Sequence, residues 1–489
     1  MPAKTEAGSG RSVVTSLLAL GAHLPRLRLS RAAIAASLGW LTSGAGAGKG
    51  QRTLAFWDED SLTMAVAAAR SALRGQDAAA VRSLSFATTT APFAEPQGAG
   101  VLRAALRLPD GCLTQDVQGT PRAALLALHA ALEAGQTALI AAGDLPPGTP
   151  GSLAEARAGD GGAAALVGPG PGLLDYLGGV SLSAPFTDRY RATGRDHPQD
   201  WEERWVREAG YLDLVPQAIA GALEKAGVSP AGIDHFVLPC AIPGVTAAVA
   251  AKAGLSAATP ASTLADTCGD TGTAQALLML AHLLETARPG QTILVAQFGQ
   301  GATALVFRAG AACAGFAPQV SPLLAQGMAE ANYMKLLAFR CQIAWDRGLR
   351  GRFIVNEALT TAWRYSDALL GFVGGRCRET GRVQFPPTRL TAGDGLHLDT
   401  QEPWPLADLG GRVATFTADL LAFSPHPPNC YGLVDLNGGG RLLMEFTDPA
   451  AASITTGTPV EFVFRIKDLD PQTGYRRYFW KAIATPVAR

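Results

Sequence analysis

The sequence has no net charge and little charge of either sign. Its 489 residues include 41 Lys and Arg against 41 Asp and Glu, and charged residues make up only 17%. Without a basic surplus the chain has no general electrostatic attraction for nucleic acid or for an anionic membrane, so we expect neither as a partner. Hydrophobic residues reach 48%, which predicts large buried cores, and the near-zero charge favours oligomers.

Paired cysteines and long apolar runs are also missing. The seven cysteines are widely spaced and odd in number, which predicts a reduced, cytoplasmic protein and not a disulfide framework. No run of about 18 apolar residues free of Gly, Pro and charge occurs, so we expect no membrane span. The apolar stretch 13–20 could mimic a short signal sequence, but it has no convincing cleavage site and is better explained as a first core strand.

The sequence contains one internal repeat, present in two copies. Residues 119–144 and 269–298 each hold a Gly-containing opening, an apolar helix, the tripeptide Gly-Gln-Thr and a short aliphatic strand. An apolar run precedes each copy, and a Gly-rich strand follows it. A strand, helix, strand, strand unit repeated across about 300 residues predicts an α/β fold of two pseudo-symmetric halves, with mixed sheets buried between helices.

Changes in composition along the chain predict its domain boundaries. We expect the two halves at 12–168 and 213–310, and between them, at 169–212, an inserted segment that is either a solvated cover or a lid over a pocket. Residues 319–371 are predicted to be a helical linker with a long helix at 321–347. Residues 372–489 alternate apolar and polar side chains between turn signals, which predicts a small all-β barrel.

Six short motifs stand in order between residues 12 and 308. They are Gly21–Arg26, Trp57–Asp60, Gly159–Ala164, Ile233–Val237, Cys268–Thr271 and Phe298–Gly301. Together they resemble the initiating condensing enzymes of the thiolase superfamily, 3-hydroxy-3-methylglutaryl-CoA synthase and β-ketoacyl synthase III. Residues 374–378, 384–387 and 479–482 resemble the zinc-ribbon and OB-fold domain that often accompanies such proteins. The resemblance implies a duplicated thiolase fold followed by an OB barrel, with an acyl-CoA thioester as ligand and no other cofactor.

The functional positions of that family are altered here. Its members use a Cys nucleophile, a His, an Asn and, in the hydroxymethylglutaryl enzymes, a Glu. The resemblance places these at Pro121, at Pro239 or a neighbour, at Asp270, and in the Thr run centred on Thr89. Each lost group is worth a factor of about 10² or more, so the changes argue against Claisen condensation by this chain alone.

Groups capable of chemistry remain beside these positions. Asp270 is a candidate base, although the same residue could simply cap its helix. Cys240 and Cys268 are candidate displaced nucleophiles, although buried cysteines are commonly inert.

Two more sites follow from the resemblance. The backbone around Thr120, Gly299 and Gly301 is a candidate oxyanion or substrate-binding site, which needs no particular side chain. The zinc ribbon has lost its paired knuckles, because Cys377 has no second Cys near it, and so we expect no zinc or other metal.

Two functions stay open, and the sequence leaves open whether the chain is an enzyme. The first is a non-catalytic or scaffolding subunit of a thiolase or acyltransferase complex acting on CoA thioesters, present as a homodimer, as a hetero-oligomer with a Cys-bearing thiolase, or as both. The second is a Cys-independent enzyme that makes or cleaves a C–C bond in a CoA thioester. If active, the chain would be an acyl-CoA acyltransferase or an aldol-type lyase, working with a partner subunit.

Overall fold

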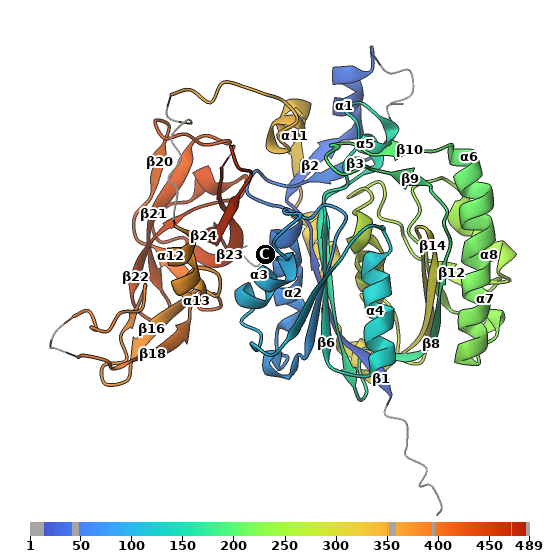
Figure 1. Cartoon of the computed structure of the whole chain (residues 1–489), viewed down its shortest axis with the longest axis horizontal. Coiled ribbons are helices and arrows are strands. Elements are labelled where there is room, and N and C mark those ends of the chain that lie inside the picture. The colour runs from blue at the N-terminus through green and yellow to red at the C-terminus, as the bar shows by residue number, and fades with distance from the viewer. Residues whose placement is uncertain are drawn as a thin grey trace, which may run out of the picture.

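The computed structural model describes residues 14–41, 48–349, 351, 358–393, 395, 397–470 and 472–485. Figure 1 shows a large α/β body beside a smaller lobe that is built mainly of strands and contains the C-terminal part of the chain. A ten-stranded sheet in the order β12-β11-β13-β14-β8-β1-β7-β6-β4-β5 runs through the body.

The ten strands are two groups of five with the same internal order. The first group is β1 (Thr15–His23), β4 (Ser83–Ala87), β5 (Leu113–Val117), β6 (Ala138–Asp144) and β7 (Gly161–Pro169). The second is β8 (Leu174–Ser183), β11 (His235–Val237), β12 (Thr259–Pro260), β13 (Thr292–Phe298) and β14 (Gly301–Ala309). β4 pairs in parallel with β5 and β6, just as β11 pairs with β12 and β13, and the remaining pairs are antiparallel. The duplicated α/β fold predicted from the repeat is confirmed.

Two helices lie between the halves of the sheet. Figure 1 shows α4 (Ala123–Ala134) with β6 on one side and β8 and β14 on the other. α4 shares one apolar cluster with α9 (Gln275–Leu284), in which every residue except His282 is buried, as is typical of a helix apolar all round. α2 (Ser61–Leu73) packs on the outer face of the first half, and α7 (Val215–Ala226) and α8 (Val245–Lys252) pack on that of the second. The N-termini of α4 and α9 therefore meet in the middle of the body.

The expected inserted segment, 169–212, begins with a strand of the main sheet. β8 pairs with β14 along its whole length and with β1 over two residues, so it starts the second half. The rest of the segment forms the short hairpin β9 (Arg189–Tyr190) and β10 (Gln199–Asp200), then α6 (Glu203–Trp205), which runs through a π-helical stretch into α7. The other small elements of the body are β2 (Leu27–Ser30), α1 (Arg31–Leu38), β3 (Gln51–Leu54), α3 (Gly98–Ala105) and α5 (Leu153–Arg157).

The long helix expected at 321–347 is wrong. The chain forms α10 (Val320–Ala325), a strand β15 (Met328–Glu330) and α11 (Tyr333–Phe339). β15 pairs in parallel with β2, and the N–H of Met328 donates to the carbonyl of Arg26 at 2.7 Å. Pairing with a distant strand therefore outweighs the local preference for helix. Two short helices, α12 (Leu359–Arg364) and α13 (Ser366–Leu369), lead into the smaller lobe.

The smaller lobe is all β, as the sequence predicts. β16 (Val373–Cys377), β17 (Val383–Gln384) and β18 (Gln401–Pro405) make a three-stranded sheet. A six-stranded sheet contains β19 (Gly411–Val413), β20 (Thr417–Asp419), β21 (Asn429–Leu436), β22 (Arg441–Glu445), β23 (Pro459–Leu469) and β24 (Arg476–Ala484). Its core includes Phe462, Phe464 and Trp480, which lie on inward-facing positions of β23 and β24.

Buried ion pairs fasten this lobe to the body. Three consecutive acids before α2 face β23 and β24 in the pairs Asp58–Lys481 (3.0 Å), Glu59–Arg465 (3.0 Å) and Asp60–Arg476 (2.8 Å). Burial alone would raise the pKa of Glu59, but the charge of Arg465 and a hydrogen bond with His23 outweigh burial and lower that pKa to about 2. The two lobes are thus joined through ion pairs in which all three carboxylates are buried.

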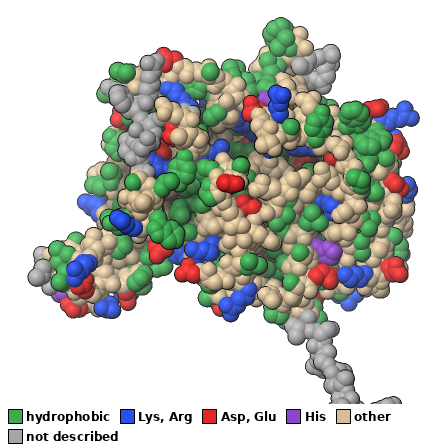
Figure 2. Space-filling view, in the orientation of Figure 1, with side chains coloured by type: hydrophobic (Ala, Val, Ile, Leu, Met, Phe, Trp, Pro, Cys, Tyr) green, Lys and Arg blue, Asp and Glu red, His purple; other side chains and the backbone are tan. Residues whose placement is uncertain are grey.

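The distribution of surface charge and the state of the cysteines agree with the balanced charge and the odd cysteine count of the sequence. In Figure 2 the basic and acidic side chains are interspersed over the described part of the visible face. All seven cysteines are free thiols. Within the described ranges, no helix is long and apolar enough to span a membrane.

Candidate functional site

The start of α4 holds the position at which the family resemblance places a nucleophile. Pro121 stands there, and proline supplies neither a nucleophilic side chain nor an N–H donor. The hydroxyl of Thr120 donates to the carbonyl of Gly299 at 3.0 Å, which brings together the residues expected to line an oxyanion site. The N–H of Gly299 already donates to the carbonyl of Gly301 at 3.0 Å. The oxyanion role of this turn stays a prediction.

Arg122 fills the space beside this turn. Its side chain is buried and donates to the carbonyl of Gly299 (2.6 Å), to the carbonyl of Gln300 (3.0 Å) and to the hydroxyl of Thr303 (3.0 Å). Burial lowers the pKa of Arg122. A Cβ on Gly301 would lie 2.0 Å from the carbonyl oxygen of Leu182, so only glycine fits there. At the start of α4, the first half of the candidate site is thus a closed, hydrogen-bonded core.

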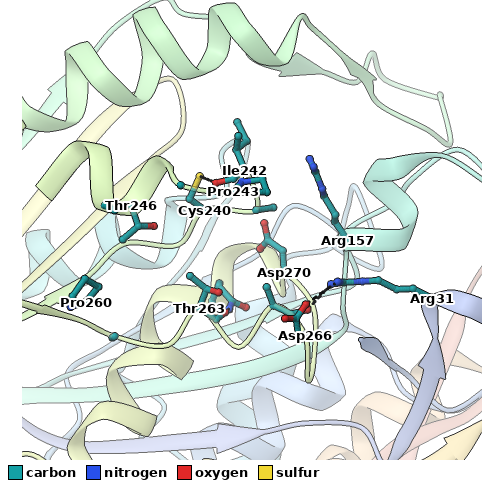
Figure 3. A pocket seen from close by; sticks show the side chains of 16 residues that line it. Arg31, Arg157, Cys240, Ile242, Pro243, Thr246, Pro260, Thr263, Asp266 and Asp270 are labelled. Carbon is teal, nitrogen blue, oxygen red and sulfur yellow. Dashed lines mark hydrogen bonds and ion pairs between the residues drawn. The ribbon is translucent and has the colours of Figure 1, made fainter. Parts of the chain in front are cut away.

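The second half of the centre keeps an open cavity of about 470 Å³. Asp270 and Cys240 both line it, and in Figure 3 their side chains point toward the same open space while Arg157 reaches over it from α5. Arg31 lies at the edge, where it forms an ion pair with Asp266 at 3.1 Å. The structure therefore brings two of the three predicted catalytic residues together, whereas Cys268, Pro239 and Pro121 are absent from the lining.

The two candidate cysteines are poor nucleophiles. Burial raises the pKa of Cys240 to about 11 and that of Cys268 to about 12, so both are thiols at neutral pH. The thiol of Cys240 lies 3.7 Å from the carbonyl oxygen of Ile242, and that of Cys268 lies 3.4 Å from the carbonyl oxygen of Gly269. Cys268 is fully buried, as an inert structural thiol would be.

Asp270 is both a cap and a cavity residue. Its carboxylate accepts from the N–H of Gly272 at 3.0 Å, at the start of a short 3-10 turn (Gly272–Ala274) that continues into α9. Burial raises the pKa of Asp270, and the nearby carboxylate of Asp144 acts in the same direction, against the hydrogen bond from Gly272 and the charge of Arg189. A carboxyl that lines a cavity and has a raised pKa is a candidate for proton transfer.

Asp144 is a site residue that the sequence prediction missed. It ends β6, is fully buried, and accepts from the hydroxyl of Thr89 at 2.9 Å and from the N–H of Thr273 at 3.2 Å. The hydroxyl of Thr90 donates to it as well. The Thr run, where the family resemblance places a Glu, is therefore hydrogen-bonded to the carboxylate of Asp144 on the neighbouring strand β6. An acid directly after an aliphatic strand was the signal that could have found it.

Each half of the body contacts the N-terminal turn of the other half's central helix. Asp144, at the end of β6, meets the N-terminal turn of α9 at Thr273. From near the end of β13, the amide of Gln297 donates to the carbonyl of Pro121 at 3.1 Å. Each helix of the repeat is thus held by a polar side chain from the other copy.

Residues 184–214 contact this centre at several points. The side chain of Arg191 donates to the carbonyl of Thr89 at 2.8 Å, and Arg157 pairs with Glu203 at 2.7 Å. Tyr211 packs on Phe298 with ring centroids 4.6 Å apart, and burial raises the pKa of its phenol, which adjoins Cys240. Whether the segment acts as a cover or as a lid stays a prediction.

The segment that resembles a zinc ribbon was expected to hold no metal. The thiol of Cys377 lies 3.2 Å from the hydroxyl of Thr400, and His397 pairs with Glu379. No group of three or more His, Cys, Asp and Glu side chains that could hold a metal ion occurs in the part of the chain that the structure describes.

Comparison with known proteins decides the family. A hydroxymethylglutaryl-CoA synthase of Pyrobaculum calidifontis is 30% identical over 259 residues, which are 51% of this chain and 73% of that protein. The chain belongs to the hydroxymethylglutaryl-CoA synthase family. The hydroxymethylglutaryl-CoA synthase of Aeropyrum pernix is 28% identical over 313 residues, which cover 62% of this chain and 86% of that protein. The resemblance seen in the sequence motifs is confirmed.

Domain and structure matches agree with this membership of the hydroxymethylglutaryl-CoA synthase family. The model of the C-terminal domain of 3-oxoacyl-[acyl-carrier-protein] synthase III matches residues 223–309, and that of the C-terminal OB-fold domain of ChsH2 matches residues 404–465. The synthase III FabH of Pseudomonas aeruginosa PAO1 has a TM-score of 0.53 at 25% identity, over 61% of this chain and 98% of that one. MvaS in complex with 3-hydroxy-3-methylglutaryl coenzyme A has a TM-score of 0.57 at 20% identity, over 67% of this chain and 92% of that one, which supports the fold.

Proposed function

We propose that this chain binds a CoA thioester without forming an acyl-enzyme, and that it serves as a non-catalytic or scaffolding subunit beside a Cys-bearing thiolase. The observation that carries the proposal is Pro121. At this one position the chain lacks the nucleophile and also lacks a backbone N–H for an oxyanion, while Arg122 fills the adjoining space. Covalent acyl transfer by the family's route needs both of these groups.

The cavity of Asp270 supports the thioester part of the proposal. Two solved relatives, MvaS with 3-hydroxy-3-methylglutaryl coenzyme A and an HMG-CoA synthase with CoA, hold such ligands. Arg31 and Arg157 line the cavity of this chain, and guanidinium groups suit the phosphates of CoA. We propose no other cofactor.

Covalent labelling and co-purification test the scaffolding role. The purified chain incubated with radiolabelled acetyl-CoA should retain no acid-stable label and release no CoA thiol. Purification from the native host should bring down a thiolase with an intact nucleophilic Cys. Turnover of acyl-CoA by the isolated chain, or a stable acylated form of it, would contradict the proposal.

The free edge of the main sheet supports a homodimer. β5 pairs on one side only, and Leu113 at its start is 68% exposed. Its counterpart in the second half, β12, has two residues and ends at Pro260, which protects that edge. We propose that two copies pair through β5.

Asp270 favours a second function, cleavage or formation of a C–C bond without an acyl-enzyme. In a retro-aldol step a base removes the proton of a β-hydroxyl, the Cα–Cβ bond breaks to leave a carbonyl product, and the thioester enolate then takes a proton at Cα. Asp270 faces the cavity with a raised pKa, so it suits the base. If an Asp270→Asn variant retained a measured lyase activity, Asp270 would be removed from the mechanism.

A further inference from the structure

Four side chains meet in the part of the smaller lobe that resembles a zinc ribbon. The thiol of Cys377, at the end of β16 (Figure 1), lies 3.2 Å from the hydroxyl of Thr400, and that hydroxyl lies 3.2 Å from the hydroxyl of Thr391. The hydroxyl of Thr380 is a further hydrogen-bond partner of the same sulfur. Cys377, Thr391 and Thr400 are buried, and Thr380 is exposed. We call these four residues the ribbon cluster.

The members of the ribbon cluster stand where a ribbon would carry its metal ligands. Cys377 and Thr380 are three residues apart, which is the spacing of a Cys-x-x-Cys knuckle. They lie on a tight turn, in which the N–H of Gly381 donates to the carbonyl of Cys377 at 2.8 Å. Thr391 and Thr400 come from a second segment, between β17 and β18. Two side chains from each of two segments are the arrangement of a closed site with four ligands.

The chemistry of the ribbon cluster does not suit zinc. Structural zinc sites are built from thiolates and imidazoles, whereas three of the four groups here are neutral hydroxyls. The imidazole of His397 is engaged elsewhere, because it pairs with Glu379. Hydrogen bonds from the hydroxyls, that of Thr380 first, lower the pKa of Cys377 to about 6. Hydroxyl donors therefore stabilise this sulfur, where a ribbon with its full set of ligands would use the metal.

The ribbon cluster also joins the two segments to each other. Beside it, the N–H of Arg378 donates to the carbonyl of Thr400 at 3.0 Å, and the N–H of Asp399 donates to the carbonyl of Arg389 at 2.7 Å. Hydrogen bonds between buried polar groups of distant segments hold those segments in one arrangement. We propose that the hydrogen bonds of the ribbon cluster have taken the place of a metal ion, so that the ribbon is closed without zinc and does not depend on the supply of metal.

Two substitutions that preserve shape test this link. Thr391→Val with Thr400→Val removes two hydroxyls from the full chain, so hydrogen exchange of the amides of Arg378 and Asp399 should become about tenfold faster or more. Thr417→Val, at an exposed position on β20 of the same lobe, should leave both rates unchanged. Treatment of the wild type with EDTA should leave them unchanged as well. Unaltered rates in the double variant, or faster exchange of the wild type in EDTA, would overturn the proposal.

Restoring thiolates tests the arrangement of the four positions separately from stability. Thr380→Cys, Thr391→Cys and Thr400→Cys together complete a set of four thiols with Cys377. This triple variant should bind one cobalt(II) ion per chain and show the visible absorption of a tetrahedral thiolate complex, which the wild type should not show. The control carries the same number of new thiols at exposed, separate positions: Thr360→Cys, Thr417→Cys and Thr473→Cys.

Two results would refute the replacement of the metal. One is cobalt binding by the triple variant that is no tighter than that of the control. The other is about one zinc ion per chain in the purified wild type, measured by atomic emission. Both results concern the ribbon alone, so neither affects the CoA thioester or the scaffolding role proposed above.

Discussion

The start of α4 is tied to the turn at Gly299 by side chains of its own chain. Pro121 has neither a nucleophilic side chain nor an N–H, and the neighbouring Arg122 donates to the carbonyls of Gly299 and Gln300. The turn that we expect to form an oxyanion site is therefore bound to a guanidinium from its own chain.

Replacing Arg122 tests how much these hydrogen bonds contribute to stability. Arg122→Ala removes the three hydrogen bonds that the buried guanidinium donates, while Thr120 and the N–H of Ala184 still donate to the carbonyls of Gly299 and Gln300. The free energy of unfolding should therefore fall by about 2 kcal/mol. Urea unfolding followed by circular dichroism measures the change. Arg308→Ala, on the same strand as Thr303 but exposed, should shift the midpoint little. An equally small effect of both variants would show that the buried guanidinium does not hold the turn.

Replacing Asp144, which is buried, tests its coupling to the half-buried carboxyl of Asp270. The charge of Asp144 helps to raise the pKa of Asp270, so in Asp144→Asn the pKa of Asp270 should move down toward its ordinary value of about 3.8. Carbon-13 NMR titration of the aspartate carboxyls reports this directly. Asp266→Asn, at the opposite edge of the cavity, provides the control. An unchanged titration of Asp270 in Asp144→Asn would mean that burial alone sets its pKa.

At the scale of elements, the joint between α2 and the strands β23 and β24 depends on three acid–base pairs. Asp58 and Lys481 are buried, and each has a second ionic partner: Lys481 lies 3.3 Å from Glu445, and Asp58 lies 3.8 Å from Arg465. Loss of either residue therefore weakens a buried charge network. These ion pairs therefore fix the position of the OB-type lobe on the body. The joint should respond to pH through Glu59, whose pKa is displaced well below its ordinary value.

Acid should loosen this joint through Glu59. Its pKa is about 2 in the folded chain and about 4.5 when unfolded, so its contribution is complete above pH 4.5 and is lost as the pH falls toward 2. The shift corresponds to about 3 kcal/mol. Chemical unfolding at several pH values between 5 and 2, compared with Glu59→Gln, isolates this group from the other carboxylates. Parallel pH curves for the two proteins would contradict the assignment.

The repeat made much of the fold predictable, because its apolar periodicity marks β4, α4 and β6 in one copy and β11, α9 and β13 in the other. β15 could not be found this way, since its strand form depends on a partner about 300 residues earlier in the chain. In the site, Asp270 and Cys240 were predicted from the motif positions, and they share a cavity. Asp144 and Tyr211 were missed because they reach the centre from the other half and from the cover, which local patterns do not reveal.

At the scale of the whole molecule, the sheet has one protected and one open edge. If β5 joins two copies, their sheets would form one continuous sheet across a symmetric pair. An interface of this kind would leave the cavity of Asp270 present twice in each assembly.

Charge at the open edge should dissociate the pair. Leu113→Asp places a carboxylate where two β5 strands would meet, so the mass measured by sedimentation at micromolar concentration should fall from dimer to monomer. Leu443→Asp, at a position that is 63% exposed on β22 of the smaller lobe, should leave the mass unchanged. A monomeric wild-type protein, or a dimer that survives Leu113→Asp, would refute pairing through β5.

The crossed contacts between the halves limit how the chain can be divided. Thr273 at the start of α9 bonds to Asp144 from the first copy, and Pro121 at the start of α4 bonds to Gln297 from the second. If the chain were cut between β7 and β8 and the pieces made separately, each would expose a helix start deprived of its polar partner and a wide apolar face. Each fragment would then fold only on association with the other. Two halves produced separately should therefore restore the fold only by complementation in trans.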